Sequence, residues 1–111
     1  MAIMRQLEPK TKSGTDFVPI AALRRRLDDL ARQFHFSVLE DEDDLGPVRY
    51  AYLQTDEGHA FLLRRYPSYP EEIVDLFIPN ELSSSRDVLD EIIDELHVPR
   101  RDVMRTKKRT D

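Results

Sequence analysis

The chain of 111 residues has no cysteine, no tryptophan and only three glycines. Without cysteine it forms no disulfide, and it has neither thiolate nucleophiles nor cysteine-ligated zinc sites. Three scattered glycines leave no glycine-rich loop of the kind that holds a nucleotide phosphate, and no G-x-S-x-G turn is present. We therefore expect no bound cofactor.

Long apolar runs are also missing. No stretch approaches the roughly 18 apolar residues of a membrane span, and "MAIMRQLEPK" lacks the apolar core of a signal peptide. The length suits one domain, and 40% hydrophobic with 35% charged residues is typical of a folded chain with a highly charged surface. These features predict a soluble, cytoplasmic protein without membrane association.

Charge is distributed unevenly along the chain. Residues 16–97 carry nineteen acidic and eight basic side chains, a net charge of −11, whereas residues 1–15 sum to +2 and residues 98–111 to +4, which together give the overall −5. The aperiodic residues 1–15 predict a flexible arm, residues 16–104 a single domain, and residues 105–111 a basic flexible tail.

The first ordered element is predicted to be a helix that begins near Pro19, because proline suits the first helical turn. Apolar residues then recur at three- and four-residue steps: Ile20, Leu23, Leu27, Leu30, Ala31 and Phe34. On the opposite face, Arg24 with Asp28 and Arg25 with Asp29 have the spacing of i,i+4 ion pairs.

After Phe36 the apolar period changes from 3.6 to 2. "FSVLE", "PVRYAYLQT", "HAFLLRRY" and "EIVDLFIP" read as four consecutive antiparallel strands, with "TDEG" as a tight hairpin turn between the second and third. We expect even positions of one hairpin strand to meet odd positions of the other. Both faces of the sheet are then apolar. Because the outer face of such a sheet is normally polar, we expect the second apolar face to be covered by self-association into a homodimer.

The segment "RDVLDEIIDELHV" predicts a final helix that ends before Pro99, with Ser84 and Asp87 as a capping box. "RDVMR" that follows is a candidate short extended segment. The order is α-β-β-β-β-α: an α+β fold with a four-stranded antiparallel meander and two helices packed on one face.

Candidate chemistry is sparse. "DEDDLG" resembles a calcium loop in its first residues, but Leu45 and Tyr52 stand where oxygen ligands are needed, so we expect an acidic turn and no metal site. The three histidines have no metal-ligand spacing. His59 is the one catalytic candidate, because a carboxylate of the preceding turn Asp56–Glu57 would raise its pKa toward the range useful for proton transfer.

The order of a helix, a strand, a second strand opening with Gly58-His59-Ala60-Phe61, the strand "IVDLFIP" and the helix "SRDVLDEII" resembles the HicA-type messenger-RNA interferases. The resemblance implies a double-stranded-RNA-binding-like fold with His59 as general acid or base. Such an enzyme has to attract phosphate, whereas residues 16–97 carry −11, so the small ribonuclease toxin is kept as the alternative.

The favoured hypothesis is a small acidic, non-enzymatic interaction module that binds a protein partner, in the manner of a regulatory, chaperone-like, immunity or antitoxin protein. Its candidate contact residues are exposed tyrosines and the acidic face of the last helix: Tyr66, Tyr69, Asp87, Asp90, Glu91, Asp94 and Glu95. A nucleic-acid role, not favoured, would use the basic C-terminal residues Arg100, Arg101, Arg105, Lys107, Lys108 and Arg109. Arg64 and Arg65 are neighbours in a strand, so they are expected on opposite faces and not in one phosphate-binding fork.

Overall fold

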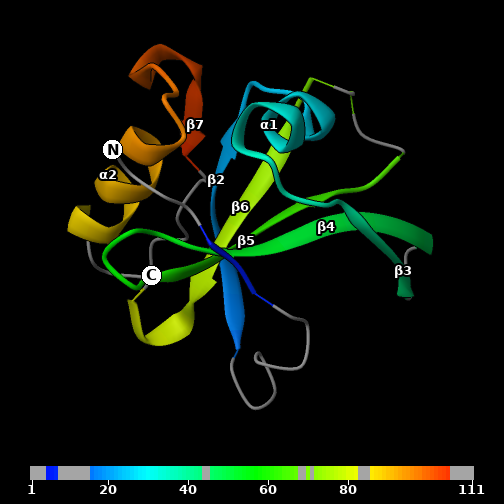
Figure 1. Ribbon diagram of the computed structural model, residues 1–111, viewed down its shortest axis with the longest axis horizontal. Coiled ribbons are helices and arrows are strands. Elements are labelled where there is room, and N and C mark those ends of the chain that lie inside the picture. Colours follow the sequence, from blue (N-terminus) through cyan, green and yellow to red (C-terminus); the bar gives the residue numbers. More distant parts are fainter. Residues whose placement is uncertain are drawn as a thin grey trace.

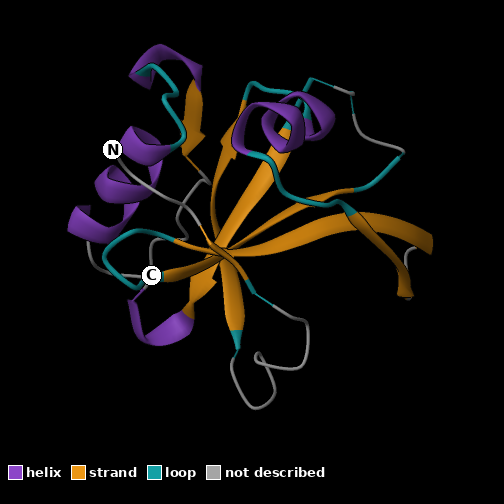
Figure 2. Ribbon diagram, in the orientation of Figure 1, coloured by secondary structure: helices purple, strands orange, loops and turns teal. Residues whose placement is uncertain are grey.

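The computed structural model describes residues 5–7, 16–43, 46–67, 70, 72–82 and 86–105 (Figure 1). Seven strands, two α-helices and two short 3-10 helices make up these residues (Figure 2). In chain order they are β1 (Arg5–Gln6), β2 (Phe17–Leu23), α1 (Leu27–Phe34), β3 (Leu39–Asp43), β4 (Gly46–Gln54), β5 (Ala60–Arg65), β6 (Val74–Pro79), η2 (Asn80–Leu82), α2 (Arg86–Glu95), η3 (Arg100–Asp102) and β7 (Val103–Arg105).

All seven strands belong to one antiparallel sheet in the order β1-β4-β5-β6-β2-β7, with β3 beside β1 on the same edge of β4. The predicted meander is confirmed, because β3, β4, β5 and β6 pair consecutively. The extended segment expected near "RDVMR" is also present, as β7. Figure 1 shows β4 and β5 running across the view while β2 runs from top to bottom, so the sheet is strongly twisted.

The predicted first helix is wrong over its first half. Residues 17–23 form β2, which pairs with β6 along its length, and helix α1 begins only at Leu27. Pro19 is tolerated in β2 because no described strand pairs with it on the β7 side, where β7 reaches only Ala21–Leu23, and because the register shifts between Pro19 and Ala21. The fold therefore starts with strands, and the four-stranded sheet grows to seven.

Helices α1 and α2 both pack on one face of the sheet, as predicted. Leu27 and Leu30 of α1 share one buried cluster with Val88, Leu89, Ile92 and Ile93 of α2. Alternate residues of the strands complete this cluster: Ala21, Leu23, Ala51, Leu53, Phe61, Leu63, Val74, Leu76 and Ile78. Because strand side chains alternate between faces, this pattern fixes which residues point away from the helices.

The hairpin between β4 and β5 has a different register from the predicted one. Ala51 lies opposite Leu63 and Leu53 opposite Phe61, so odd positions meet odd positions. The reason is the connection, which spans the five residues Thr55–His59 between the paired residues Gln54 and Ala60. Gly58 supports this turn at φ +98°, a conformation that L residues rarely adopt.

The second face of the sheet carries a separate apolar cluster. Tyr52, Leu62 and Phe77 are each at most 8% exposed in the single chain, with Leu7, Phe17 and Tyr50 packed against them. The Tyr52 ring makes edge contacts with Phe17 and Tyr50 at centroid distances of 5.6 and 5.4 Å. The three central side chains are thus buried without a second copy, so the apolar second face does not by itself require a homodimer, and the homodimer stays a prediction.

A histidine in the left-handed conformation, which glycine usually adopts, follows each helix within two residues. His35 closes α1 at φ 60°, and His97 follows α2 at φ 56°. The His97 ring also stacks on Phe34 of α1, with ring centroids 5.7 Å apart, which joins the two helix ends. None of the described helices is long and apolar enough to cross a membrane.

Candidate functional site

His59, the catalytic candidate from the sequence, has its carboxylate partner on helix α2. Its Nδ1 lies 3.0 Å from both carboxylate oxygens of Glu91, and the side chains of His59 and Glu91 are 36% and 18% exposed. The hydroxyl of Thr55, the one buried polar residue of the described chain, donates a hydrogen bond to the same carboxylate. Thr55 also accepts the backbone N–H of His59 at 3.1 Å. The partners Asp56 and Glu57 expected from the sequence do not hold the imidazole.

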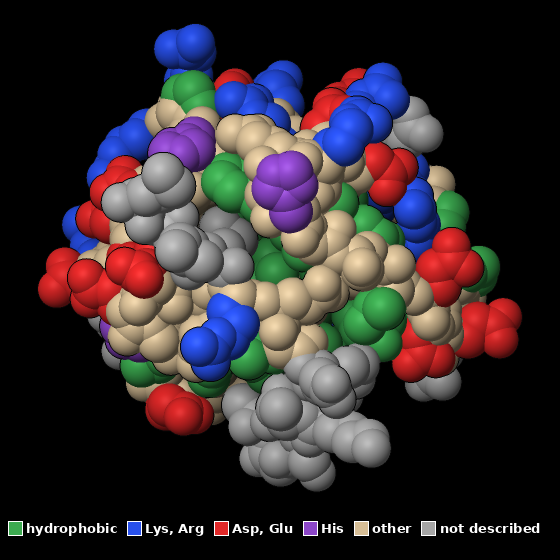
Figure 3. Space-filling model, viewed as in Figure 1, with side chains coloured by type: hydrophobic (Ala, Val, Ile, Leu, Met, Phe, Trp, Pro, Cys, Tyr) green, Lys and Arg blue, Asp and Glu red, His purple; other side chains and the backbone are tan. Residues whose placement is uncertain are grey.

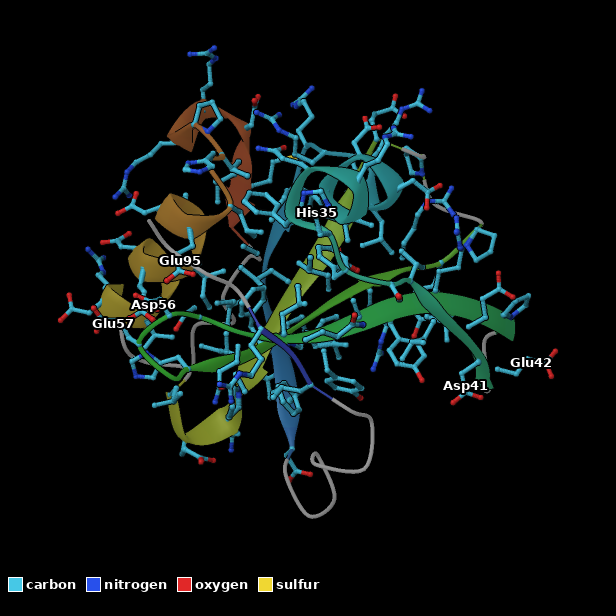
Figure 4. All side chains as sticks on the ribbon, in the orientation of Figure 1. His35, Asp41, Glu42, Asp56, Glu57 and Glu95 are labelled. Atoms are coloured by element: carbon cyan, nitrogen blue, oxygen red, sulfur yellow. The ribbon has the colours of Figure 1, made fainter. Side chains whose placement is uncertain are left out.

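The turn between β4 and β5 is fastened to α2 by a second carboxylate. Glu95 accepts the backbone N–H of Asp56 at 2.9 Å. Burial raises the pKa of Glu95 above its usual value, against the lowering effect of this hydrogen bond, and the negative charges of Glu91, Asp56 and Glu57 raise it further. Figure 4 shows Asp56, Glu57 and Glu95 gathered at this end of the hairpin, far from Asp41 and Glu42 on β3.

This arrangement has a limited chemical repertoire. A carboxylate that accepts from Nδ1–H leaves Nε2 of His59 as the atom able to take or give a proton. No described nucleophile is held by the imidazole, because the Thr55 hydroxyl bonds to Glu91 instead. The described residues contain no group of three or more His, Asp or Glu side chains that could hold a metal ion.

The two arginines of the same strand do not join this site. Arg65 lies six residues from His59 at the other end of β5, roughly 20 Å away at the rise of a strand. Arg64 lies on the second sheet face, with its guanidinium 4.5 Å from the Phe77 ring centroid, whereas Arg65 lines a cavity beside α1. The predicted divergence of Arg64 and Arg65 is therefore confirmed.

Most of the predicted acidic contact residues already have partners within the chain. Glu91 and Glu95 hold the hairpin turn, and Asp90 forms an ion pair with Arg100 at 3.2 Å. Asp87 and Asp94 are exposed. Of the tyrosines, Tyr66 is 9% exposed with its hydroxyl accepting from Arg64, and Tyr69 lies outside the described residues.

Only some of the basic C-terminal candidates lie in the part of the chain that the structure describes. Lys107, Lys108 and Arg109 lie outside the described residues, as does the side chain of Arg105. Arg100 and Arg101 are exposed on η3, which is bound to the end of β2: the Arg24 N–H donates to the Asp102 carbonyl at 2.8 Å, and Arg25 forms an ion pair with Asp102 at 2.8 Å.

Arginines gather at this end of the molecule, which we call the arginine end. Its members come from the β2–α1 connection, α1, the adjoining ends of β4 and β5, and η3: Arg24, Arg25, Arg26, Arg32, Arg49, Arg65, Arg100 and Arg101. In Figure 3 basic side chains line the upper edge of the molecule, while acidic side chains dominate its left and right. With the five described carboxylates that pair with them (Asp28, Asp29, Glu40, Asp90 and Asp102), the arginine end sums to +3 in a chain of −5.

A shallow cavity of about 230 Å³ lies within the arginine end, lined by Arg26, Leu27, Asp28, Asp29, Arg32, Arg49 and Arg65. Arg49 bonds both carboxylate oxygens of Asp28, and this pair replaces the Arg24–Asp28 pair expected within a helix. Arg65 lies directly opposite Arg49 in the β4–β5 register. Like charges in this position repel each other, and the carboxylates of Asp28 and of Glu40, which lies 3.8 Å from Arg49, offset this repulsion.

Sequence reasoning missed the arginine end because its members are spread over nearly eighty positions. Periodicity predicts Arg24 and Arg25 on the polar face of a helix that in fact begins only at Leu27, and it predicts Arg49 and Arg65 as strand residues. Only the pairing of β2 with β7 brings η3 beside the β2–α1 connection. The sole sequence signal was the local run of three arginines.

The fold and the two clusters define a small α+β protein with an antiparallel sheet, a fastened His–Glu pair at one end and an arginine end at the other. Comparison with family models, curated proteins and solved structures found no match to this chain.

Proposed function

We propose that this chain is a small non-enzymatic interaction module that docks an acidic segment of a partner protein onto the arginine end. The observation that carries the proposal is the gathering of arginines into a +3 surface on an acidic protein. Three of them, Arg24, Arg65 and Arg101, form no ion pair with any other described residue. Unpaired cations held together cost stability through repulsion, which favours a role in binding.

The residue type supports a ligand with carboxylates or phosphates. Every basic side chain of the arginine end is an arginine, and the guanidinium fork matches a planar carboxylate with two parallel hydrogen bonds. Arginine is also enriched among the residues that dominate protein interfaces.

The flanks of the arginine end favour a short acidic segment over a long polyanion. Asp41 and Glu42 on β3 and Asp87 and Asp94 on α2 are exposed acidic residues on either side. At physiological salt a charge acts over about 8 Å, so an extended nucleic acid would meet these carboxylates where it leaves the arginines. A protein segment confined to the arginine end avoids that repulsion.

The proposal is tested by the binding of a fluorescein-labelled peptide of ten alternating Asp and Glu residues, measured by fluorescence polarisation. We expect the wild type to bind, and a double variant, Arg24→Glu with Arg101→Glu, to bind at least about tenfold more weakly, because each lost charge pair contributes on the order of 1 kcal/mol. Both positions are exposed, so folding is spared.

The matched control is Arg5→Glu with Arg86→Glu, which changes the net charge by the same amount at two exposed arginines outside the arginine end. It should bind within about twofold of the wild type. Equal loss in both variants would reduce the effect to net charge and overturn the proposal. A duplex oligonucleotide that binds more tightly than the peptide, and loses binding only in the first variant, would replace the protein partner with nucleic acid.

The ribonuclease alternative is favoured by one observation, the imidazole of His59 held by Glu91. Its surroundings oppose it, because Glu95, Asp56 and Glu57 lie beside the imidazole and repel phosphate. Incubation of a mixed-sequence RNA with wild type and His59→Ala separates the two functions. We expect no cleavage by either protein, and cleavage by the wild type alone would establish the ribonuclease.

A further inference from the structure

We propose that the second face of the sheet is a self-association surface, on which two copies of the chain meet about a two-fold axis and Arg64 of each copy pairs with Asp75 of the other. The inference does not rest on the proposed function, because the arginine end lies elsewhere: Arg49 and Arg65 line the cavity beside α1, on the helix face. It rests on a guanidinium and a carboxylate that lie side by side on the second face without being bonded.

The first argument is the placement of Arg64 and Asp75. They lie directly opposite each other in the register of β5 and β6 and their charges interact, but no hydrogen bond or ion pair joins these two described side chains. The Arg64 guanidinium lies instead 4.5 Å from the ring centroid of Phe77 and donates to the Tyr66 hydroxyl at 3.1 Å. Among the described residues Asp75 accepts no hydrogen bond, and most N–H groups of the Arg64 guanidinium remain available.

The second argument is the cost of Asp75 in the single chain. Strand β6 lies between β5 and β2 in the sheet, and Asp75 is its one charged residue. Aspartate is depleted in strands, and burial raises the pKa of Asp75 above its ordinary value, an effect that the Arg64 charge only partly offsets. A half-buried carboxylate without a donor lowers the stability of the fold, and a guanidinium from a second copy would supply the donor.

The third argument is the symmetry of the surroundings. One row of half-buried side chains crosses the sheet on the second face: Tyr50, Arg64, Asp75, Ala22 and Met104. When two sheets pack face to face, a two-fold axis that runs along the strands between β5 and β6 reverses this row. Each Arg64 then stands over Asp75 of the partner copy, and each Tyr50 stands over Ala22. The complement of the row is the row itself, which favours a second copy of this chain over a different partner.

The test is sedimentation equilibrium of the full chain over roughly 1–100 µM protein. We expect the wild type to dimerise, and Arg64→Asp and Asp75→Arg each to dimerise at least about a hundredfold more weakly, because each brings like charges together twice in a symmetric dimer. An equimolar mixture of the two variants should recover a dimer with one chain of each, since both contacts then join opposite charges.

A milder variant, Asp75→Asn, keeps the shape of the side chain and removes a carboxylate that burial destabilises. At low protein concentration it should therefore be at least as stable as the wild type. It should nevertheless dimerise at least about tenfold more weakly, the loss expected for a charge-assisted hydrogen bond.

Arg86→Asp and Asp94→Arg, at exposed positions of α2, are the matched controls: they make the same charge changes away from the second face and should dimerise as the wild type does. A wild type that stays monomeric throughout the range would overturn the proposal. So would charge-reversal variants that keep the wild-type affinity, or a mixture of them that stays monomeric although each variant has the circular dichroism of the folded chain.

Discussion

Replacement of Arg65 by glutamine should change the stability of the free protein only slightly, although it removes one of two opposed arginines. Arg65 lies opposite Arg49, and two unit charges about 6 Å apart in water repel by about 0.7 kcal/mol. Asp28 binds Arg49 with both oxygens and Glu40 lies 3.8 Å from the same guanidinium, so two carboxylates offset this repulsion. We expect a change of at most about 0.3 kcal/mol, which for a chain of this length corresponds to about 1 °C in the unfolding midpoint.

Urea unfolding followed by circular dichroism measures this change, because the chain has no tryptophan for fluorescence. Any change should disappear in 1 M NaCl, where the screening length falls to about 3 Å, and a gain of more than about 0.5 kcal/mol would show that the carboxylates do not offset the repulsion. Arg5→Gln is the control: it removes a cation from a protein of net charge −5 without relieving an opposed pair, so it should be neutral or slightly destabilising. A loss of more than about 0.5 kcal/mol in Arg65→Gln would mean that Arg65 already has a stabilising partner, and the reasoning would fail.

Three further predictions concern the framework of the protein. Glu95→Gln should raise the free energy of unfolding at pH 7 by less than about 1 kcal/mol. The folded-state pKa of Glu95 is raised, so the Glu95 carboxyl contributes stability below its unfolded-state pKa, and this contribution is lost as the pH rises through the folded-state pKa. The advantage should vanish near pH 4 in thermal unfolding, and an advantage that grows on acidification would contradict it. Leu62→Ala and Leu63→Ala, on opposite sheet faces, should each cost about 2–5 kcal/mol in urea unfolding, and a cost for Leu62 that depends on protein concentration would show that a second copy covers that face. His35→Gly should stabilise the chain by up to about 1 kcal/mol, because glycine adopts the left-handed helix end without strain, and a destabilised variant would reveal an unrecognised contact of the imidazole.

The part of the fold predicted best from the sequence is the run from β3 to β6. There the apolar period of two is strong, the connections are short and each strand pairs with its neighbour in the chain. For residues 17–23 the sequence predicts a helix, because Ile20 and Leu23 fit a period of 3.6 when they are counted with Leu27 and Leu30. Its strand pairing with β6, more than fifty residues away, overrides that local pattern.

The candidate site was likewise predicted where it depends on neighbours in the chain, and missed where it depends on residues far away in the sequence. The sequence predicts His59 at the start of a strand after a flexible turn, and the structure places it at the last position of the connection, directly before β5. Its partner Glu91 lies thirty-two positions away and was assigned to an exposed acidic face, because helical periodicity alone does not reveal that a hairpin turn covers that face. The hairpin register was missed because the connection is one residue longer than the turn signal "TDEG" suggests.

The central claim is that an acidic protein segment docks on the arginine end. It is tested most directly by NMR chemical-shift mapping of the ¹⁵N-labelled protein during titration with the acidic peptide. We predict that the largest shifts occur at the backbone amides of Arg24–Arg26 and of Arg100–Asp102, and that the turn Thr55–His59 is unaffected. Shifts confined to α2 or to the second sheet face around Tyr52, or no saturable shifts at all, would contradict the account.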